Sequence, residues 1–150
     1  MNANKLLVVA SEQEMRNLGE KLGLILVGGE VIELSGDVGA GKTTFVKGLA
    51  VGLGIDEEVQ SPSFTISRVY DARDDLLLAH YDFYRLADAG IMADELQETT
   101  QDPGTITVIE WADIVEGVLP EGRIQISFTT PTETSRQLVI EGASAVVENL

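Results

Sequence analysis

The first part of the chain alternates between strand-like apolar runs and helix-like apolar stripes. Residues 6–9 form a short apolar run that predicts a strand. Ser11 followed by Glu14 fits S-x-x-E, a pattern that opens helices because both side chains satisfy free backbone N–H groups. The apolar positions behind it keep a helical spacing: Met15, Leu18, Leu22 and Ile25. We therefore expect a strand and then a helix, which Gly28 and Gly29 end.

A second strand and helix follow at once. The apolar run 31–34 predicts a buried strand, and Phe45, Leu49 and Leu53 form an i, i+4, i+8 stripe typical of a helix. Gly48 and Gly52 interrupt this helix, and each lowers its intrinsic stability by about 1 kcal/mol relative to Ala. Glycines at such positions predict close packing against a neighbouring element.

The middle of the chain predicts a hairpin. Residues 64–70 and 76–84 are two strand-like runs, and the polar stretch 71–75 joins them. A parallel crossover needs a dozen residues or more, so this pair should be antiparallel. Residues 86–101 are compatible with either a helix or an ordered loop.

The last part of the chain predicts further strands around a short helix. We expect strands at 106–109, 124–128 and around Leu138 and Ile140, a short helix at 113–118, and a loosely held tail at 143–150. The whole chain, 1–150, is predicted to be one α/β domain. Its core would be a mixed, mainly parallel sheet with helices on both faces and antiparallel strand additions.

The loop between the second strand and helix carries the clearest chemical signal. Residues 36–43 fit G-x-x-x-x-G-K-[ST], the phosphate-binding P-loop. Backbone N–H groups of such a loop cradle phosphate oxygens, the lysine reaches the β- and γ-phosphates, and the following hydroxyl ligates Mg²⁺. The core of the predicted domain is therefore that of a P-loop NTPase. The predicted nucleotide-binding residues are Gly36, Asp37, Val38, Gly39, Ala40, Gly41, Lys42, Thr43 and Thr44.

Two carboxylates stand at the ends of apolar strands, where α/β sheets usually place ligand-binding groups. Asp82 ends the run from Leu76, and Glu110 ends the run from Ile106. Each is a candidate for holding Mg²⁺ or positioning a water molecule, with helix capping or surface solvation as the alternative. His80 lies on the same strand face as Asp82, and a structural role is its simpler interpretation.

Other side chains could assist the site. Ser61, Pro62, Ser63, Phe64 and Thr65 form a hydroxyl-rich segment after the P-loop helix, where nucleotide-sensing switch loops lie in many P-loop proteins. Arg85 could stabilise charge, although a surface ion pair is the simpler interpretation. Trp111 could be a core residue, cover a nucleotide or meet a partner.

Composition narrows the class of protein. The net charge is −15, from 25 acidic and 10 basic residues, which argues against unaided binding of nucleic acid. The chain has no cysteine, so disulfides and thiolate chemistry are excluded. No apolar run approaches the roughly 20 residues of a membrane span, and the N-terminal apolar stretch is too short for a signal peptide. We expect a cytoplasmic protein.

Several segments together resemble one family. The P-loop 36–44, the segment 61–65, the stretch His80-Tyr81-Asp82-Phe83-Tyr84-Arg85-Leu86 and the stretch Val108-Ile109-Glu110-Trp111 occur in the order and spacing of the TsaE family. Its members are small bacterial ATPases of tRNA threonylcarbamoyladenosine biosynthesis. The resemblance extends from about residue 11 to 140.

This resemblance implies a cytoplasmic, Mg²⁺-dependent ATPase that works with the TsaD–TsaB pair and meets tRNA only through these partners. By position, Lys42 would bind phosphate, Thr43 and Glu110 would hold Mg²⁺, and Asp82 would assist the metal or the water. Residues 61–65 would form the switch, and Trp111 would lie at the site or partner surface. Lys42, Asp82 and Glu110 are thus the predicted catalytic residues.

Other functions stay open on the residues alone. A small-molecule or nucleotide kinase usually carries several lid arginines, whereas the arginines here are scattered. A GTPase would need the N-K-x-D element that reads guanine, which this sequence lacks. A nucleotide-binding interaction subunit without meaningful hydrolysis is a further alternative.

Overall fold

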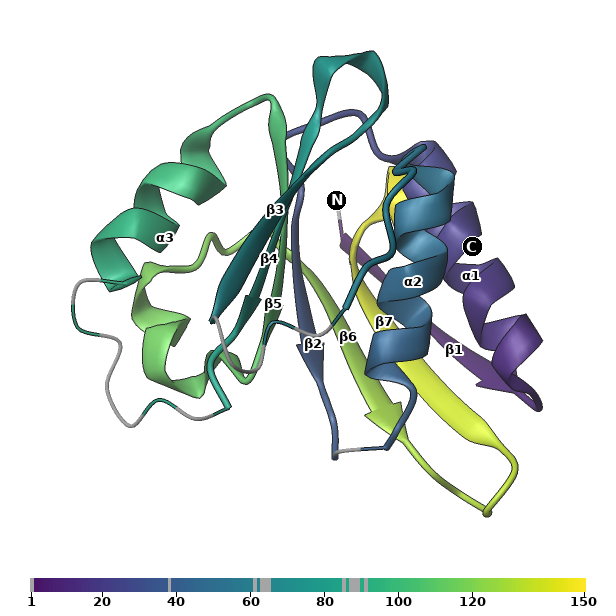
Figure 1. Ribbon diagram of the computed structural model, residues 1–150. Coiled ribbons are helices and arrows are strands. Elements are labelled where there is room, and N and C mark those ends of the chain that lie inside the picture. The colour runs from purple at the N-terminus through teal and green to yellow at the C-terminus, as the bar shows by residue number, and fades with distance from the viewer. Residues whose placement is uncertain are drawn as a thin grey trace.

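The fold is a seven-stranded sheet with helices on both faces (Figure 1). A computed structural model describes residues 2–37, 39–60, 62, 66–84, 86, 90 and 92–150. The strands are β1 (Asn2–Val9), β2 (Val31–Ser35), β3 (Ser67–Asp71), β4 (Leu77–Asp82), β5 (Thr105–Glu110), β6 (Ile124–Thr129) and β7 (Arg136–Ala143). The α-helices are α1 (Glu12–Ile25), α2 (Lys42–Gly52), α3 (Met92–Gln101) and α4 (Ser144–Val147). The 3₁₀ helices are η1 (Arg73–Asp75) and η2 (Ala112–Val118).

The strand order is β1-β7-β6-β2-β5-β4-β3. The central strands β6, β2, β5 and β4 are parallel to one another. Antiparallel strands extend this core on both sides, β3 beside β4 and β7 with β1 beside β6. The predicted fold class is confirmed, and so is the antiparallel pairing of β3 with β4. The predicted start of that hairpin, Phe64 and Thr65, lies outside the described residues.

Each face of the sheet has its own hydrophobic core. Side chains alternate along a strand, so Ile32 and Leu34 of β2 pack with α1 and α2, whereas Val31 packs on the opposite side. The second core takes Leu96 from α3 and several residues from η2. Parallel strands covered on both faces bury the side chains of both faces, which explains why β5 is buried throughout and β2 is buried up to Leu34, with Glu33 included.

Helices α1 and α2 approach each other through glycines on both. A Cβ at Gly48 would lie 2.1 Å from the Arg16 backbone oxygen, and one at Gly19 would lie 2.2 Å from the Phe45 oxygen. Gly23 and Gly52 face the partner helix equally closely. The close packing predicted from glycines in the second helix is confirmed, and its counterpart on α1 explains why both helices carry them.

The ends of α1 are satisfied by side chains. Ser11 accepts a hydrogen bond from the Glu14 backbone N–H at 3.1 Å, so the predicted N-cap is confirmed. The Glu14 carboxylate in turn accepts a hydrogen bond from the backbone N–H of Ala10. At the other end, the guanidinium of Arg73 donates to the carbonyls of Gly23, at 2.7 Å, and Leu26, at 3.0 Å. The β3–β4 hairpin therefore supplies the positive charge that the last turn of α1 lacks.

One predicted segment differs in the structure, and the structure decides one assignment that the sequence left open. Residues 143–150 were expected to be a loosely held tail, but they complete β7 and form α4, with Val147 and Leu150 buried. These side chains join the core shared with α1, and Lys5 donates to the Leu150 carbonyl. Within the ambiguous stretch 86–101, residues 92–101 form the helix α3, which buries Leu96 in the second core.

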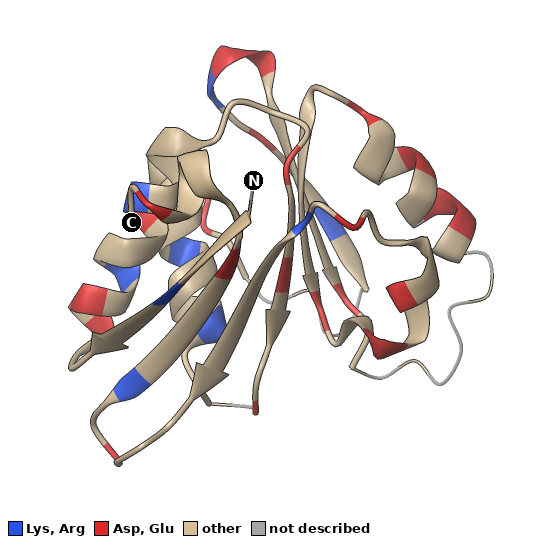
Figure 2. Cartoon of the chain, turned by 180° about the vertical axis from the view of Figure 1, so that it is seen from behind, with Lys and Arg blue, Asp and Glu red and all other residues tan. Residues whose placement is uncertain are grey.

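Acidic side chains lie on many elements, while lysine and arginine are scattered (Figure 2). Helix α3 carries Asp94, Glu95 and Glu98, all exposed, and no basic residue. Across the described residues, no helix is long and apolar enough to cross a lipid bilayer.

The helix contact yields a stability prediction. Gly48→Ala should lower the free energy of unfolding by roughly 1–3 kcal/mol, because the added methyl would overlap the backbone of α1. In an open helix the same change would be stabilising. Thermal or urea unfolding measures the difference.

Gly117→Ala is the matched control, since nothing lies within 4 Å of a Cβ at that position in η2. It should leave stability within about 0.5 kcal/mol of the parent chain. Equal stability of the two variants would contradict the close helix contact.

Candidate functional site

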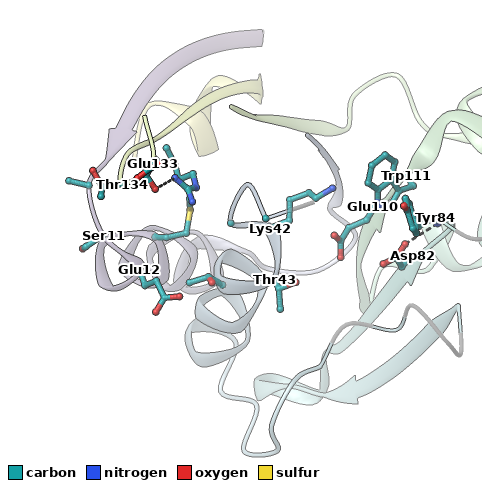
Figure 3. Close-up of a pocket in the computed structure, with 16 residues that line it drawn as sticks. Ser11, Glu12, Lys42, Thr43, Asp82, Tyr84, Glu110, Trp111, Glu133 and Thr134 are labelled. Atoms are coloured by element: carbon teal, nitrogen blue, oxygen red, sulfur yellow. Dashed lines mark hydrogen bonds between the residues drawn. The ribbon is translucent and has the colours of Figure 1, made fainter. Parts of the chain in front are cut away.

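A pocket of about 650 Å³ opens beside the P-loop, at the carboxyl ends of β4 and β5. Figure 3 shows Lys42 and Glu110 entering it from opposite sides and pointing toward one another. The predicted site residues in its wall are Gly39, Gly41, Lys42, Thr43, Thr44, Asp82, Glu110 and Trp111. The fold thus brings the P-loop together with both predicted carboxylates.

Glycine is required at two points of the P-loop. Gly36 has φ 136°, and a Cβ there would lie 2.6 Å from the Phe128 carbonyl oxygen. Gly41 is the N-cap of α2 with φ 103°, and a Cβ there would press against the Met15 side chain. Only glycine fits both the left-handed backbone and the space. Helix α2 therefore begins with its backbone N–H groups directed at the pocket.

Lys42 is buried at the start of α2. Its ammonium donates to the Gly36 carbonyl oxygen at 2.6 Å and lies 4.1 Å from the ring centroid of Trp111. Burial lowers the pKa of Lys42, while Glu110, Asp82 and Asp37 act in the opposite direction. The lysine is thus a cation withdrawn from water, and this lower-dielectric environment strengthens its attraction for phosphate.

Asp82 and Glu110 are neighbours across the parallel pairing of β4 and β5. Both side chains are buried, with exposed fractions of 4% and 3%. The carboxylate of Asp82 accepts the backbone N–H of Tyr84 at 2.9 Å (Figure 3). Glu110 is also in register with Leu34, next to the strand end from which the P-loop begins. Two carboxylates therefore line the edge of the sheet nearest the P-loop.

Trp111 adopts an unusual backbone conformation, with φ 58° and ψ 54°. Left-handed backbone is costly for a residue with a bulky side chain, and such strain concentrates at functional sites. The conformation turns the chain sharply after Glu110. The indole covers the Lys42 ammonium and contacts the ring of Tyr84, with centroids 4.8 Å apart.

Comparison with known proteins places the chain in a family. Residues 9–138 match the sequence profile described as "Threonylcarbamoyl adenosine biosynthesis protein TsaE". The chain belongs to the TsaE family. It is 42% identical to the tRNA threonylcarbamoyladenosine biosynthesis protein TsaE of Treponema pallidum over 134 residues, covering 89% of this chain and 97% of that protein.

Two comparisons with Bacillus subtilis proteins agree with this assignment. The TsaE protein of that organism is 42% identical over 111 residues, which cover 73% of this chain and 68% of the relative. The crystal structure of YdiB superposes with a TM-score of 0.80 at 30% identity, covering 99% of this chain and 93% of that one. The predicted family is confirmed, and with it a family role in tRNA threonylcarbamoyladenosine biosynthesis.

Part of the predicted TsaE site lies outside the described residues. This applies to Val38 of the P-loop, to Arg85 and to Ser61, Ser63, Phe64 and Thr65 of the predicted switch. Of that segment, Pro62 is described, and its carbonyl accepts the Ile66 backbone N–H at 2.6 Å. Ile66 has φ 70° and its own carbonyl accepts the Asp82 backbone N–H at 2.8 Å. The backbone beside the predicted switch is thus tied directly to the Asp82 strand.

The pocket also contains residues that sequence reasoning missed. They come from the start of α1, the end of β4 and the turn before β7: Ala10, Ser11, Glu12, Met15, Tyr84, Glu133, Thr134 and Arg136. Arg136 donates to backbone carbonyls of its own turn, including that of Glu133 at 3.2 Å. Apart from Tyr84, which belongs to the family stretch 80–86, no short motif marks these positions. The one local signal was the helix cap at Ser11, which was interpreted as structural only.

The donor chemistry fits a magnesium ion. The Thr43 hydroxyl and the Glu110 carboxylate both line the pocket, and oxygen donors are what Mg²⁺ prefers. Among the described residues, no three His, Asp or Glu side chains gather into a self-sufficient metal site. Mg²⁺ bound here would therefore draw its other ligands from nucleotide phosphates and water.

Lys42 is the one lysine in the described part of the pocket wall, so no second lysine can take over its contact with phosphate. Lys42→Ala should weaken ATP binding by roughly 10- to 100-fold or more, since one charge-assisted hydrogen bond contributes about 1.5–3 kcal/mol. Fluorescence of Trp111, the lone tryptophan, reports binding because the indole lies against the lysine.

Lys47→Ala is the control, because Lys47 lies in the same helix but outside the pocket wall. It should bind ATP like the parent chain. Normal binding by the Lys42 variant would reject the phosphate role of this residue.

Proposed function

We propose that this TsaE protein is a cytoplasmic, Mg²⁺-dependent ATP hydrolase whose nucleotide cycle drives or resets the TsaD–TsaB complex. The observation that carries the proposal is that Lys42, Thr43, Asp82 and Glu110 line one common pocket. These are the parts that phosphoryl transfer to water requires: a cation on the phosphates, metal ligands and a carboxylate near the attacking nucleophile.

Each residue has a distinct task in this proposal. The loop backbone and Lys42 bind the β- and γ-phosphates, and Lys42 leaves the Gly36 carbonyl to do so. Thr43 and Glu110 hold Mg²⁺, which neutralises charge on the phosphate oxygens when bound. Asp82 positions water or the metal, and its hydrogen bond with the Tyr84 backbone holds the carboxylate in place. Trp111 shields the lysine from water, which strengthens its electrostatic effect.

Hydrolysis is favoured over phosphorylation of a small molecule. A kinase site usually closes with arginines over the transferred phosphoryl group. The described part of the pocket wall contains one arginine, Arg136. Its guanidinium donates hydrogen bonds to backbone carbonyls of its own turn. This supports an ATPase whose rate depends on a partner.

The charge of the chain supports an indirect relation to tRNA. A net charge of −15 repels a polyanion, and Figure 2 shows the lysine and arginine positions spread over separate helices and strands, with acidic positions among them. We therefore assign the contact with tRNA to TsaD–TsaB, with this chain supplying nucleotide energy.

The deciding experiment is Mg²⁺-ATP hydrolysis by the isolated chain and by its mixture with TsaD–TsaB and tRNA. We expect slow hydrolysis alone and an increase of at least about tenfold in the complex, since charge-stabilising groups supplied in trans typically accelerate P-loop hydrolysis. ATP left uncleaved in the full mixture would favour a nucleotide-binding subunit without hydrolysis. A fast isolated chain would contradict partner dependence.

The metal role of Glu110 predicts a split between binding and turnover. Glu110→Ala should reduce Mg²⁺-dependent hydrolysis by roughly 10- to 1000-fold, while ATP binding weakens less, because the phosphate cradle stays intact. Asp113→Ala is the control, since Asp113 is exposed in η2 and outside the pocket wall. An unchanged rate in the Glu110 variant would reject its metal role.

A further inference from the structure

His80 is a buried polar residue that the proposed chemistry has not used. It lies in β4 with an exposed fraction of 1%, two residues before Asp82. Its Nε2 is 2.7 Å from Oε2 of Glu110, and both side chains are almost fully enclosed. The lone histidine of the chain is therefore in direct contact with a predicted metal ligand.

The surroundings of the ring decide which nitrogen carries the proton. Nδ1 is buried and meets no hydrogen-bond partner within the described part of the chain. A proton on Nδ1 would therefore be a buried donor without an acceptor. It would also leave two acceptors, Nε2 and the Glu110 carboxylate, facing each other unless the carboxyl were protonated. A proton on Nε2 avoids both problems, so the imidazole donates to Oε2.

This hydrogen bond constrains the carboxylate. Strand β4 holds the imidazole in place through its pairing with both β3 and β5. With Oε2 engaged on one side, Glu110 presents its remaining acceptor capacity to the pocket, on the side of Lys42 and Thr43 (Figure 3). Carboxylate and imidazole pairs of this kind orient metal ligands in proteins generally.

The strand structure of β4 does not require a histidine at position 80. A β-branched aliphatic residue would satisfy the strand position and bury no unpaired nitrogen. The preceding residues on the same face of β4 and β5 are Leu78, Ile106 and Val108, which are aliphatic and pack in the core with α1 and α2. The imidazole is the exception, and its one described polar contact is Glu110.

We propose that His80 is a positioning residue that holds Glu110 in the orientation required to bind the Mg²⁺ of a bound nucleotide. The proposal rests on the proposed metal role of Glu110. It adds that the imidazole acts through this carboxylate and touches neither nucleotide nor metal.

The test compares two amide variants of His80. Gln places an amide nitrogen near the position of Nε2 and keeps a donor for Glu110, whereas the shorter Asn cannot reach it. ADP binding is measured through Trp111 fluorescence, across a Mg²⁺ titration and in EDTA, so turnover does not enter the readout. His80→Asn should lose about 10- to 100-fold of Mg²⁺ affinity, and His80→Gln should recover most of it.

A structural role alone would give a different result. It would lower the thermal stability of the Asn and Gln variants together and leave the Mg²⁺ dependence of folded protein unchanged, which would overturn the proposal. ADP affinity in EDTA should be the same in parent and Asn variant. A parent chain that binds ADP equally well in Mg²⁺ and EDTA would overturn the metal site as well, so the two failures are distinguishable.

Two further measurements test the mechanism. In a Glu110→Ala background, His80→Asn should alter Mg²⁺ affinity by less than about twofold, because the group through which it acts is gone. An effect as large as in the parent chain would overturn the coupling.

Because His80 is the lone histidine, ¹⁵N spectra of the imidazole assign its tautomer directly. We expect the proton on Nε2, and a proton on Nδ1 instead would overturn the donor assignment and the proposal.

Discussion

The in-register parallel pairing of β2, β5 and β4 is the constraint on which the pocket depends. Parallel strands end at the same edge of the sheet, so β2 leads into the P-loop beside the carboxylates of β5 and β4. The pairing sets Glu110 opposite Asp82 and Leu34. A slip of one residue would turn both carboxylates to the opposite face, where α3 and η2 pack and no phosphate loop lies.

The helices fix the other half of the site. Lys42 begins α2, so its position depends on how closely that helix packs on α1, and glycines on both helices set this distance. Arg73 contacts the last carbonyls of α1, and its backbone N–H donates to the Leu53 carbonyl just after α2, at 2.8 Å. The β3–β4 hairpin thus contacts both helices at their carboxyl ends, away from the pocket. Its second strand, β4, places Asp82 in the pocket wall. One hairpin supports both sides of the site.

Buried polar groups converge where the sheet meets the P-loop. His80, Asp82, Glu110 and Lys42 are all among the described buried polar residues. Burying such groups is costly unless they are paired, and here they are paired mainly with one another and with backbone groups. Their arrangement leaves a cation and carboxylates facing a common space. This is a preorganised electrostatic environment, and that is the property on which phosphoryl-transfer catalysis depends.

The sequence by itself determined the local features: the phosphate loop, the cap at Ser11, the strand ends at Asp82 and Glu110, the hairpin and the family. Each depends on neighbouring residues or on a rule about strand ends. Tertiary structure decided what depends on contacts distant in sequence. The turn before β7 reaches the pocket, the last residues pack into the core and His80 meets Glu110. Such pairings leave no periodic or compositional trace, because only the folded sheet brings those side chains together.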